Sequence, residues 1–443
     1  MKKIMDLRKN RNIAVTGIAG GGKTVFLTSL ISHLMEFGNG YFHPGRGVDI
    51  TDFREIPSKK AWPPRFEHSA FREDLARGSW PEKSKDCSEY ICEFRRSDRM
   101  LGRQRLTFFD FPGERVADAA IAAYSKYEDW SEHILKHFEN QYDYARITAP
   151  YLQYVQQENV SLDGVLALYK ETLAKLILDF KPLISPSTFL LDKNGQLAEP
   201  GQVTEISQAR YAGISKDEQF APLPREVCRK YPRMAARMST LYKKYRKNVV
   251  LPMFEKISNS DTLVVLVDIP SLLLGGAGRY NDNRQILLDL FELLRPDSHV
   301  GSQILSYLKL WQNSLARIAF VAAKADMVHP MDVENKRMLS LLKMITDRPA
   351  RMLPKVQKEW FVCSACYSTY PAEGVRRLQG KLARNNPENK FMGYNVSELP
   401  AKWPESWRLG AYHFYKINPD APENYLFPPR HQGLDQIFEF ISK

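Results

Sequence analysis

The sequence predicts an α/β fold in which a mostly parallel sheet has helices on both faces and carries an inserted α-helical domain. Near-continuous apolar runs alternate with helical patterns, a glycine cluster joins the first strand to the first helix, and a long helical stretch separates the early strands from the later ones. We expect the sheet domain to comprise residues 1–116 and 256–443, and the inserted domain to comprise 117–255.

The amino-terminal elements follow from hydrophobic periodicity. Residues 12–16 form a short β-branched run, and the apolar residues of 25–37 recur at helical spacing. The stretch 38–80 is rich in proline, glycine and charge, so we expect a loop there. Two strands, 89–95 and 104–111, are expected to pair as a hairpin, because a polar, arginine-rich turn separates them.

The later elements continue this alternation. Helices are predicted at 117–145, 149–182, 229–247, 283–295 and 332–346, and strands at 262–269, 316–323 and 360–363. Residues 367–432 contain many prolines and aromatic residues without a period, so we expect an irregular segment. A closing helix is predicted at 433–442.

The composition excludes several classes of protein. With 443 residues, of which 44% are hydrophobic, the chain can bury a large core, so it is neither disordered nor collagen-like. Its five cysteines are too few for a dense disulfide framework. We expect no signal peptide, and no apolar run reaches the roughly 20 residues that cross a bilayer. The sequence therefore predicts a cytoplasmic protein, with peripheral attachment at the inner face of the membrane left open.

The segment from Gly17 to Thr24 fits the phosphate-binding pattern GxxxxGK(S/T) between a strand and a helix. Glycines let the backbone wrap a phosphate, and the helix directs its positive end at the anion. Lys23 would reach the β- and γ-phosphates, and the Thr24 hydroxyl would bind Mg²⁺. The predicted nucleotide-binding residues here are Ala19, Gly20, Gly21, Gly22, Lys23, Thr24 and Val25. The alternative is a chance match, which the flanking strand and helix make less favourable.

Asp110 ends an apolar strand, and Gly113 follows it in the pattern DxxG. A carboxylate in this place can hold Mg²⁺ through water, and the glycine amide can contact a γ-phosphate. An ordinary turn after a strand has the same residue types for conformational reasons. The place of this pattern after the phosphate-binding loop favours the functional interpretation.

Two later strands also end in polar motifs. Lys324 and Asp326 follow the strand at 316–323; the carboxylate can accept hydrogen bonds from N1 and N2 of guanine, while the lysine stem lies over the base. A solvated turn is the alternative for such a pair. Ser364, Ala365 and Cys366 follow the next strand and match the last guanine-binding loop. All four motifs occur in the expected order, each at a strand end.

With these motifs the chain resembles translation-factor-type P-loop GTPases, and within that group it is similar to the YcjX-like family of bacterial proteins. The resemblance rests on the sequences GIAGGGKT, DFPGE and AKAD, and on the large helical insertion. It implies a P-loop NTPase fold with a Ras-like GTPase domain, binding of GTP and GDP with Mg²⁺, and a link to stress responses.

The chain departs from the usual GTPase pattern at two positions. Ala323 stands where an asparagine or threonine ties the loop to the base, so guanine affinity is expected to suffer. Glu114 follows Gly113 where small GTPases have a water-orienting glutamine, and a carboxylate cannot donate an amide hydrogen bond. We assign the catalytic roles to Lys23, Gly113 and Glu114, and expect slow hydrolysis.

Two further features of the sequence bear on metal binding. Ser84 is the candidate for the switch hydroxyl that closes over Mg²⁺, with Thr51 as its rival. The Cys363–Cys366 pair has no second cysteine or histidine pair at zinc spacing, so its overlap with the guanine loop explains it better than a metal or redox site. Metal binding is therefore assigned to Thr24, Ser84 and Asp110.

The formal net charge of +12 favours an anionic partner. Residues 225–247 contain nine basic residues and one acidic residue, which could bind an acidic membrane surface or an acidic protein, or could simply form a solvated helix face. Nucleic acid is the less favoured partner.

Three functions remain open from the sequence. The leading hypothesis is a Mg²⁺-dependent GTPase switch. An ATP-dependent kinase or ATPase would prefer adenine and would make the AKAD element accidental. A nucleotide-sensing adaptor at the membrane would bind GTP with little hydrolysis.

Overall fold

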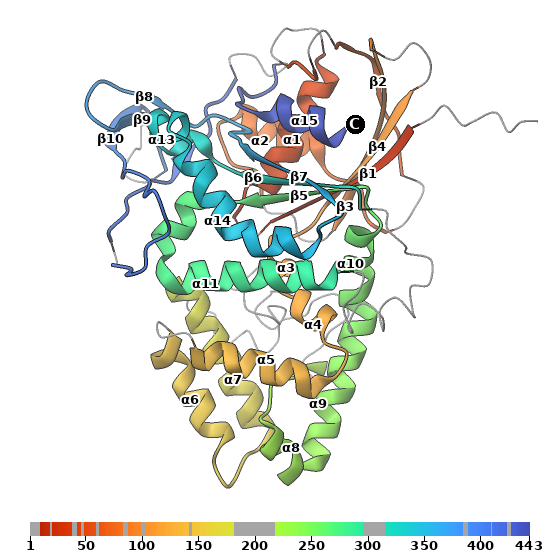
Figure 1. The fold of residues 1–443 in the computed structure, drawn as a ribbon, viewed down its shortest axis with the longest axis vertical. Helices are drawn as coiled ribbons and strands as arrows, with labels where there is room; N and C mark the ends of the chain where they lie inside the picture. Colours follow the sequence, from red (N-terminus) through yellow and green to blue (C-terminus); the bar gives the residue numbers. More distant parts are fainter. Residues whose placement is uncertain are drawn as a thin grey trace, which may run out of the picture.

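A computed structural model describes most of the chain. The described residues are 9–17, 20–37, 42–45, 48–58, 62–82, 87–98, 103–140, 144–180, 218–295, 315–383, 389–408, 410–422 and 427–443. Figure 1 shows a sheet with helices around it in one half of the molecule, and a body of helices in the other half.

The described chain contains a seven-stranded sheet with the strand order β2-β3-β4-β1-β5-β6-β7. The strands are β1 (Lys9–Gly17), β2 (Ile50–Glu55), β3 (Ser88–Arg96), β4 (Gln104–Asp110), β5 (Thr262–Val267), β6 (Arg317–Ala322) and β7 (Gln357–Val362). β1 runs parallel to β4 and β5, and β5, β6 and β7 are parallel to one another. β3 is antiparallel to both of its neighbours. The predicted α/β class, the mostly parallel sheet and the β3–β4 hairpin are confirmed.

Helices cover both faces of this sheet (Figure 1). Successive residues of a strand point to opposite faces, so Ile13 and Val15 of β1 pack with α1 (Lys23–Met35) and α15 (Leu434–Ile441). Ala14, between them, belongs to the second core with α11 (Ile269–Leu293) and α14 (Arg337–Met352). Because both faces of the sheet are covered, β5 and β6 are apolar along almost their whole length.

Between β4 and β5, the elements that the structure describes are all helical. They are α3 (Gly113–Val116), α4 (Ala119–Ala123), α5 (Tyr127–Asn140), α6 (Ala145–Val155), α7 (Leu162–Phe180), α8 (Arg225–Lys230), α9 (Pro232–Tyr245), the π-helix η5 (Arg246–Val250) and α10 (Leu251–Ser258). One apolar core contains Trp130 of α5 together with Phe320 of β6. The boundaries 117–255 of a separate domain therefore stay a prediction. No helix in the described part of the chain is both long and apolar enough to cross a membrane.

Several predicted helices differ in extent. The single helix expected at 117–145 is divided among α3, α4 and α5, and the one expected at 149–182 is interrupted between α6 and α7. α11 begins at Ile269, well before the predicted 283, and Gly276 forms a kink within it with φ of 75°. Glycines in its first turns hid this helix from the sequence pattern, because glycine lowers helix propensity.

The loop predicted at 38–80 was wrong in two places, since it contains β2 and α2 (His68–Ala76). α2 buries His68, Arg72 and Leu75, which lie on one face of the helix. Arg72 pairs with Glu36 at 3.1 Å, so part of its buried face is polar. A search for apolar periodicity cannot detect a helix of this kind.

The segment 367–432 is not wholly irregular either. It contributes a small sheet made of β8 (Thr369–Pro371), β9 (Arg377–Leu382), β10 (Phe391–Asn395) and β11 (Ile417–Asn418), with β9 paired to the other three. These strands are short, and the turns between them obscured the alternation. We call this the carboxyl-terminal sheet.

Candidate functional site

The turn between β1 and α1 requires glycine for two different reasons. Gly17 has φ of 147°, and a Cβ there would lie 2.4 Å from the carbonyl oxygen of Leu266 on β5. Gly22 has φ of 81° and caps α1, and no described atom would lie within 4 Å of its Cβ. Gly17 therefore permits close packing of two strands, whereas Gly22 permits a left-handed turn into the helix.

Lys23 begins α1, and its side chain is buried in this turn. Its Nζ donates a hydrogen bond of 2.9 Å to the carbonyl oxygen of Gly17, and the residue is 7% exposed. The first amides of a helix have no partner within the helix, and they carry the positive end of its dipole. The start of α1 can therefore receive an anion, with Lys23 supplying a full charge beside it.

Asp110 lies at the end of β4, next to the glycine-rich turn. It is in register with Val15 of β1 and is 1% exposed. The amide of Phe111 donates a hydrogen bond of 3.1 Å to the Val15 carbonyl, which holds the segment after β4 against β1. Parallel pairing of β1 and β4 thus brings the DxxG segment, with Gly113 at the start of α3, to the glycine-rich turn.

The loop after β6 holds Asp326 in a buried hydrogen-bond network. Its Oδ1 accepts a hydrogen bond of 2.7 Å from the Ser364 hydroxyl, and its Oδ2 accepts from the amide (2.8 Å) and the hydroxyl (2.6 Å) of Ser368. Burial raises the pKa of Asp326 above its usual 3.8, although both serines act in the opposite direction. A carboxylate offers about four acceptor positions, so one remains on Oδ1.

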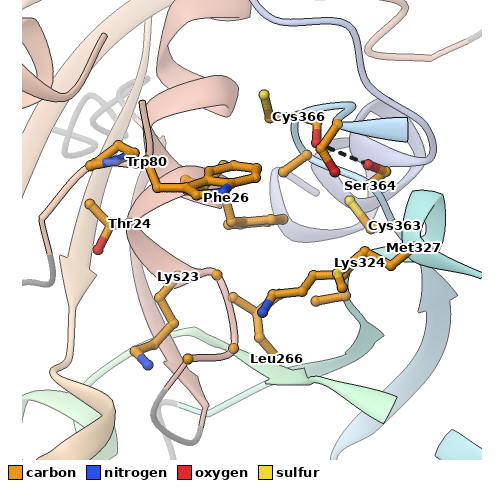
Figure 2. Close-up of a pocket in the computed structure, with 18 of the residues that line it drawn as sticks. Lys23, Thr24, Phe26, Trp80, Leu266, Lys324, Met327, Cys363, Ser364 and Cys366 are labelled. Carbon is orange, nitrogen blue, oxygen red and sulfur yellow. Dashed lines mark hydrogen bonds between the residues drawn. The ribbon is translucent and has the colours of Figure 1, made fainter. Parts of the chain in front are cut away.

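A cavity of about 420 Å³ joins these segments, and Figure 2 shows the side chains around it. It lies where the carboxyl ends of the parallel strands meet, the usual ligand site of open α/β sheets. Its lining includes the predicted residues Gly20, Gly21, Gly22, Lys23, Thr24, Val25, Gly113, Lys324, Asp326, Ser364, Ala365 and Cys366. The volume is within the range of about 300 to 1,000 Å³ typical of small-molecule sites.

Some predicted site residues are not among those lining the cavity. Asp110 is not a lining residue, but it pairs with Val15 on the strand that leads into the glycine-rich turn. Ala19 and Ser84 lie outside the described residues, as does the side chain of Glu114. Thr51, the rival for the switch hydroxyl, is on β2 at the sheet edge and does not line the cavity.

Trp80 is a cavity residue that the sequence analysis missed. It comes shortly before β3, and its indole Nε1 donates a hydrogen bond of 2.7 Å to the carbonyl oxygen of Ile417 on β11. Lys416 and Ile417 line the cavity as well, so the carboxyl-terminal sheet forms part of its wall. A tryptophan next to a proline in a long loop was the available signal for Trp80, but nothing local identified Lys416.

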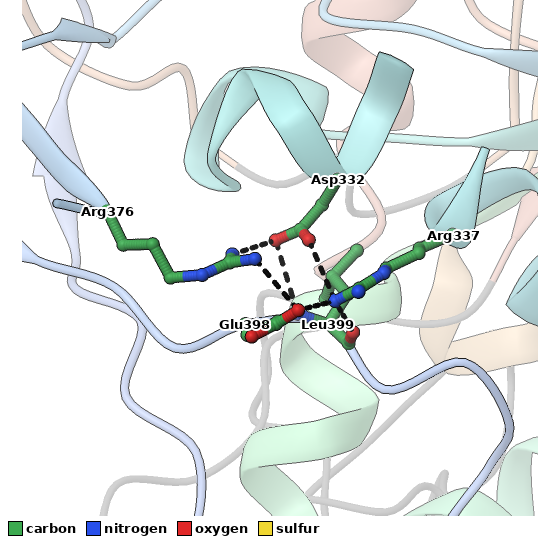
Figure 3. A network of polar contacts seen from close by, with 5 residues as sticks. All are labelled: Asp332, Arg337, Arg376, Glu398 and Leu399. Atoms are coloured by element: carbon green, nitrogen blue, oxygen red, sulfur yellow. Dashed lines mark hydrogen bonds and ion pairs between the residues drawn. The ribbon is translucent and has the colours of Figure 1, made fainter. Parts of the chain in front are cut away.

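A polar network anchors the carboxyl-terminal sheet (Figure 3). The buried Asp332, on α13 (Pro330–Glu334), accepts hydrogen bonds from Arg376 (2.8 Å), Arg337 (3.4 Å) and the amide of Leu399 (3.2 Å). Glu398 pairs with both arginines. Because α13 follows the loop with Asp326, the network ties the sheet that carries Ile417 to the Asp326 side of the cavity.

Cys363 and Cys366 are free thiols and both are buried. Burial raises the pKa of each thiol, so neither favours the reactive thiolate form. Cys363 also contributes to the loop itself, because its carbonyl oxygen accepts a hydrogen bond of 3.1 Å from the Ala325 amide. The two cysteines are thus part of the packing around the cavity.

The basic stretch 225–247 is less available to a partner than its composition indicates. Arg225 pairs with Asp129 and Glu132, Lys244 pairs with Glu218, and Arg246 donates to the carbonyl oxygens of Ile121 and Ala122. The other six cations of the stretch are exposed, and one of them, Lys230, lies over the ring of Tyr231. They are Arg229, Lys230, Arg233, Arg237, Lys243 and Lys247. Part of the predicted charge therefore serves contacts within the chain.

Comparison with known proteins gives a consistent result. The sequence model of the YcjX-like family (DUF463) matches residues 12–443. A protein of Shewanella oneidensis (strain MR-1) named Ras-like GTPase YcjX is 22% identical, with 98% of this chain and 94% of that protein aligned. A protein of the same name from Escherichia coli (strain K12) is also 22% identical, with 98% and 95% aligned.

Proposed function

Because this chain belongs to the YcjX-like family, we propose that it binds GTP and GDP with Mg²⁺, hydrolyses GTP slowly and acts as a nucleotide-dependent switch. One observation carries the proposal: a single cavity contains the glycine-rich turn with Lys23 and the loops with Asp326 and Ser364. A nucleotide requires an anion site and a base site joined in this way. The two relatives named Ras-like GTPase support the same activity.

In this proposal the phosphates lie at the start of α1. Lys23 would exchange its hydrogen bond with the Gly17 carbonyl for contacts with the β- and γ-phosphates. The amides of the first helical turn would receive the β-phosphate. Since Lys23 is buried, its charge would act on the phosphates in surroundings that screen it less than water does.

The residues beside the glycine-rich turn fit a magnesium ion. Thr24 supplies a hydroxyl and Asp110 a carboxylate, and Mg²⁺ prefers such oxygen ligands. Among the described residues, no group of three or more His, Cys, Asp or Glu side chains could hold a metal ion. In this proposal one or two protein groups and the nucleotide phosphates would hold the ion. Bound there, Mg²⁺ would neutralise charge on the phosphate oxygens.

The base would lie between the loops after β6 and β7. The free acceptor position on Asp326 Oδ1 would take one guanine N–H. A second N–H would need Oδ2, which already accepts two hydrogen bonds from Ser368, so Ser368 would release one of them. Adenine presents no such pair of donors, so Asp326 would favour guanine.

Slow turnover is proposed for a chemical reason. The amide of Gly113 would contact the γ-phosphate, but Glu114 stands where a glutamine would orient the attacking water. A carboxylate can accept a hydrogen bond from that water but cannot donate one to the phosphate.

The helical region would report the nucleotide state. We propose that residues 117–255 form a domain that responds to movement of α3, and that the exposed cations of α8 and α9 meet an anionic membrane or acidic protein in the cytoplasm. The order of elements supports this, because α3 leads directly into the helical region.

Competition binding with fluorescent GDP tests the proposal. Unlabelled GDP and GTP should displace the probe, and ADP and ATP should not. Displacement by ADP alone would instead indicate an ATPase or kinase. Phosphate release at saturating GTP and Mg²⁺ then separates an enzyme from an adaptor: a complete lack of turnover would contradict the hydrolysis.

A further inference from the structure

Asp268 follows β5 and makes two kinds of contact. Its Oδ2 accepts a hydrogen bond of 2.6 Å from the Lys324 ammonium, which forms an ion pair between the end of β5 and the loop after β6. Its Oδ1 accepts a hydrogen bond of 3.0 Å from the Ser271 amide, which caps α11. The Asp268 side chain is 8% exposed, so the ion pair is shielded from solvent on the carboxylate side.

Lys324 adopts an unusual backbone conformation. Its φ and ψ are 61° and 43°, in the left-handed region that non-glycine residues rarely occupy. A residue remains there only where surrounding contacts hold it. The backbone supplies two such contacts, from the Ala323 amide to the Val267 carbonyl (2.9 Å) and from the Ala325 amide to the Cys363 carbonyl (3.1 Å). The ion pair with Asp268 adds a contact through the side chain.

This contact occurs in the loop that lacks the usual side-chain tie. Ala323 is 7% exposed and offers only a methyl group, so the residue before Lys324 cannot hold the loop by a polar side chain. Figure 2 shows the Lys324 side chain extending along the cavity from its own loop towards Leu266 of β5. Asp268 lies two residues beyond Leu266, so Lys324 reaches the neighbouring strand end from within the cavity wall.

We propose that Asp268 is a positioning residue for guanine recognition, whose ion pair with Lys324 fixes the loop that carries Asp326. This inference rests on the proposed function. The pair takes the place of the polar side chain missing at Ala323. It also sets the lysine stem along the cavity, where a base would lie against it.

The electrostatics of the pair agree with this role. Burial would raise the pKa of Asp268, but the charge and hydrogen bond of Lys324, with the hydrogen bond of Ser271, lower it below the usual 3.8. Asp268 is therefore ionised at neutral pH. A helix cap alone does not require that charge, because a neutral asparagine caps a helix equally well.

Two substitutions separate positioning from capping. Asp268→Asn keeps an oxygen for the Ser271 amide and removes the charge; Lys324→Met keeps an apolar stem and removes the ammonium. We expect each to weaken GDP binding about tenfold, the size of one charge-assisted hydrogen bond, and to reduce the preference for GDP over IDP, which lacks the 2-amino group. Both substitutions remove the same ion pair, so the double variant should bind GDP no more weakly than either single variant does.

Asp261→Asn is the matched control. Asp261 precedes the same strand at its other end, where its carboxylate accepts from Arg11 and the Asn12 amide, far from the cavity. It should leave the ratio of GDP to IDP affinity unchanged. The inference would be overturned if Asp268→Asn kept full GDP affinity and selectivity while Lys324→Met lost them. Asp268 would then act only as a helix cap. If the parent protein binds no guanine nucleotide, the proposed function itself fails.

Discussion

The hydroxyl of Ser364 donates a hydrogen bond of 2.7 Å to Oδ1 of Asp326, across 38 residues of sequence. The first residue follows β7 and the second follows β6, and these strands are adjacent and parallel. Two weak sequence motifs thereby become one buried site. Their geometry leads to the first of five predictions.

Asp326→Asn should shift the preference from guanosine towards xanthosine nucleotides. The new amide oxygen can accept the hydrogen bonds of Ser368, while the amide NH₂ faces the C2 oxygen of xanthine; the Ser364 hydroxyl can rotate to become an acceptor. Competition titration with GDP and XDP measures the shift, and Ser364→Ala controls for a general loss of order. If the variant still prefers GDP over XDP as strongly as the parent does, Asp326 does not recognise the base.

Lys23→Ala and Thr24→Ala should both abolish GTP hydrolysis. The first removes the charge proposed for the β- and γ-phosphates and should weaken GTP binding by about 10- to 100-fold, as expected for a charged hydrogen bond. The second removes the hydroxyl proposed as a ligand of Mg²⁺. The difference in GTP affinity between Thr24→Ala and the parent should therefore become smaller when Mg²⁺ is omitted. Thr24→Ser keeps the hydroxyl and should retain turnover. Normal phosphate release from either alanine variant would refute the phosphate site.

Trp80→Ala should accelerate GDP dissociation by roughly tenfold, because stacking of a base on an aromatic side chain contributes about 1 to 3 kcal/mol. Trp80→Phe keeps a ring and loses only the hydrogen bond to Ile417, so its effect should be smaller. Stopped-flow release of fluorescent GDP gives the rates. Trp403→Phe is the control, since its indole also donates to a carbonyl, that of Leu341, but does not line the cavity. Equal rates in all variants would place the nucleotide away from Trp80.

The stability of the protein should fall as pH rises above about 6.5, because of His137. Burial would lower the pKa of His137, but its hydrogen bond (2.5 Å) and charge interaction with Asp282 outweigh burial and raise it above 6.5. The charged pair therefore stabilises the fold fully below 6.5, and this contribution is lost as pH rises through the raised pKa.

Thermal unfolding between pH 5.5 and 8.5 measures this effect. His137→Ala should cost about 3 to 5 kcal/mol at pH 6, as expected when a buried charge loses its partner. Asp282→Asn should remove the same pH dependence. A parent protein whose midpoint does not change over this range would show that the fold does not raise the pKa of His137.

Tyr245 should couple the nucleotide site to α9. Its hydroxyl donates a hydrogen bond of 2.7 Å to Asp118, which is fully buried just after α3, and Arg115 of α3 lies 3.9 Å from the same carboxylate. We expect a non-hydrolysable GTP analogue to change hydrogen exchange, relative to GDP, across 114–130 and 225–247. Tyr245→Phe should suppress the change in the second segment and preserve the first.

The control for this coupling is Tyr231→Phe at the other end of α9, whose hydroxyl donates to the Glu158 carbonyl, within the helical region. It should leave both exchange differences in place. Identical hydrogen-exchange profiles of the parent protein in the two nucleotide states would contradict the switch model. They would not contradict the proposed nucleotide site. Tyr245→Phe should also destabilise the fold by about 1 to 3 kcal/mol, since a buried carboxylate loses a donor.

Local patterns predicted the elements that are apolar on their buried sides. β5 and β6 lie within one or two residues of their predicted positions, since strands covered on both faces must be apolar throughout. β1 begins three residues before its predicted start. α2 was missed because it buries His68 and Arg72, whose partners come from elsewhere in the chain. The carboxyl-terminal sheet was missed because its short strands are held by contacts such as those of Asp332.

The α/β class and the geometry of the glycine-rich turn follow from local sequence, because backbone freedom at Gly22 and the start of a helix are properties of adjacent residues. Three relationships became visible only in the folded chain: Lys23, Asp326 and Ser364 border one cavity, Trp80 contacts Ile417 in its wall, and Asp268 pairs with Lys324. These pairings depend on which strands lie side by side. Strand order is set by packing of the whole core, so no short stretch of sequence contains it.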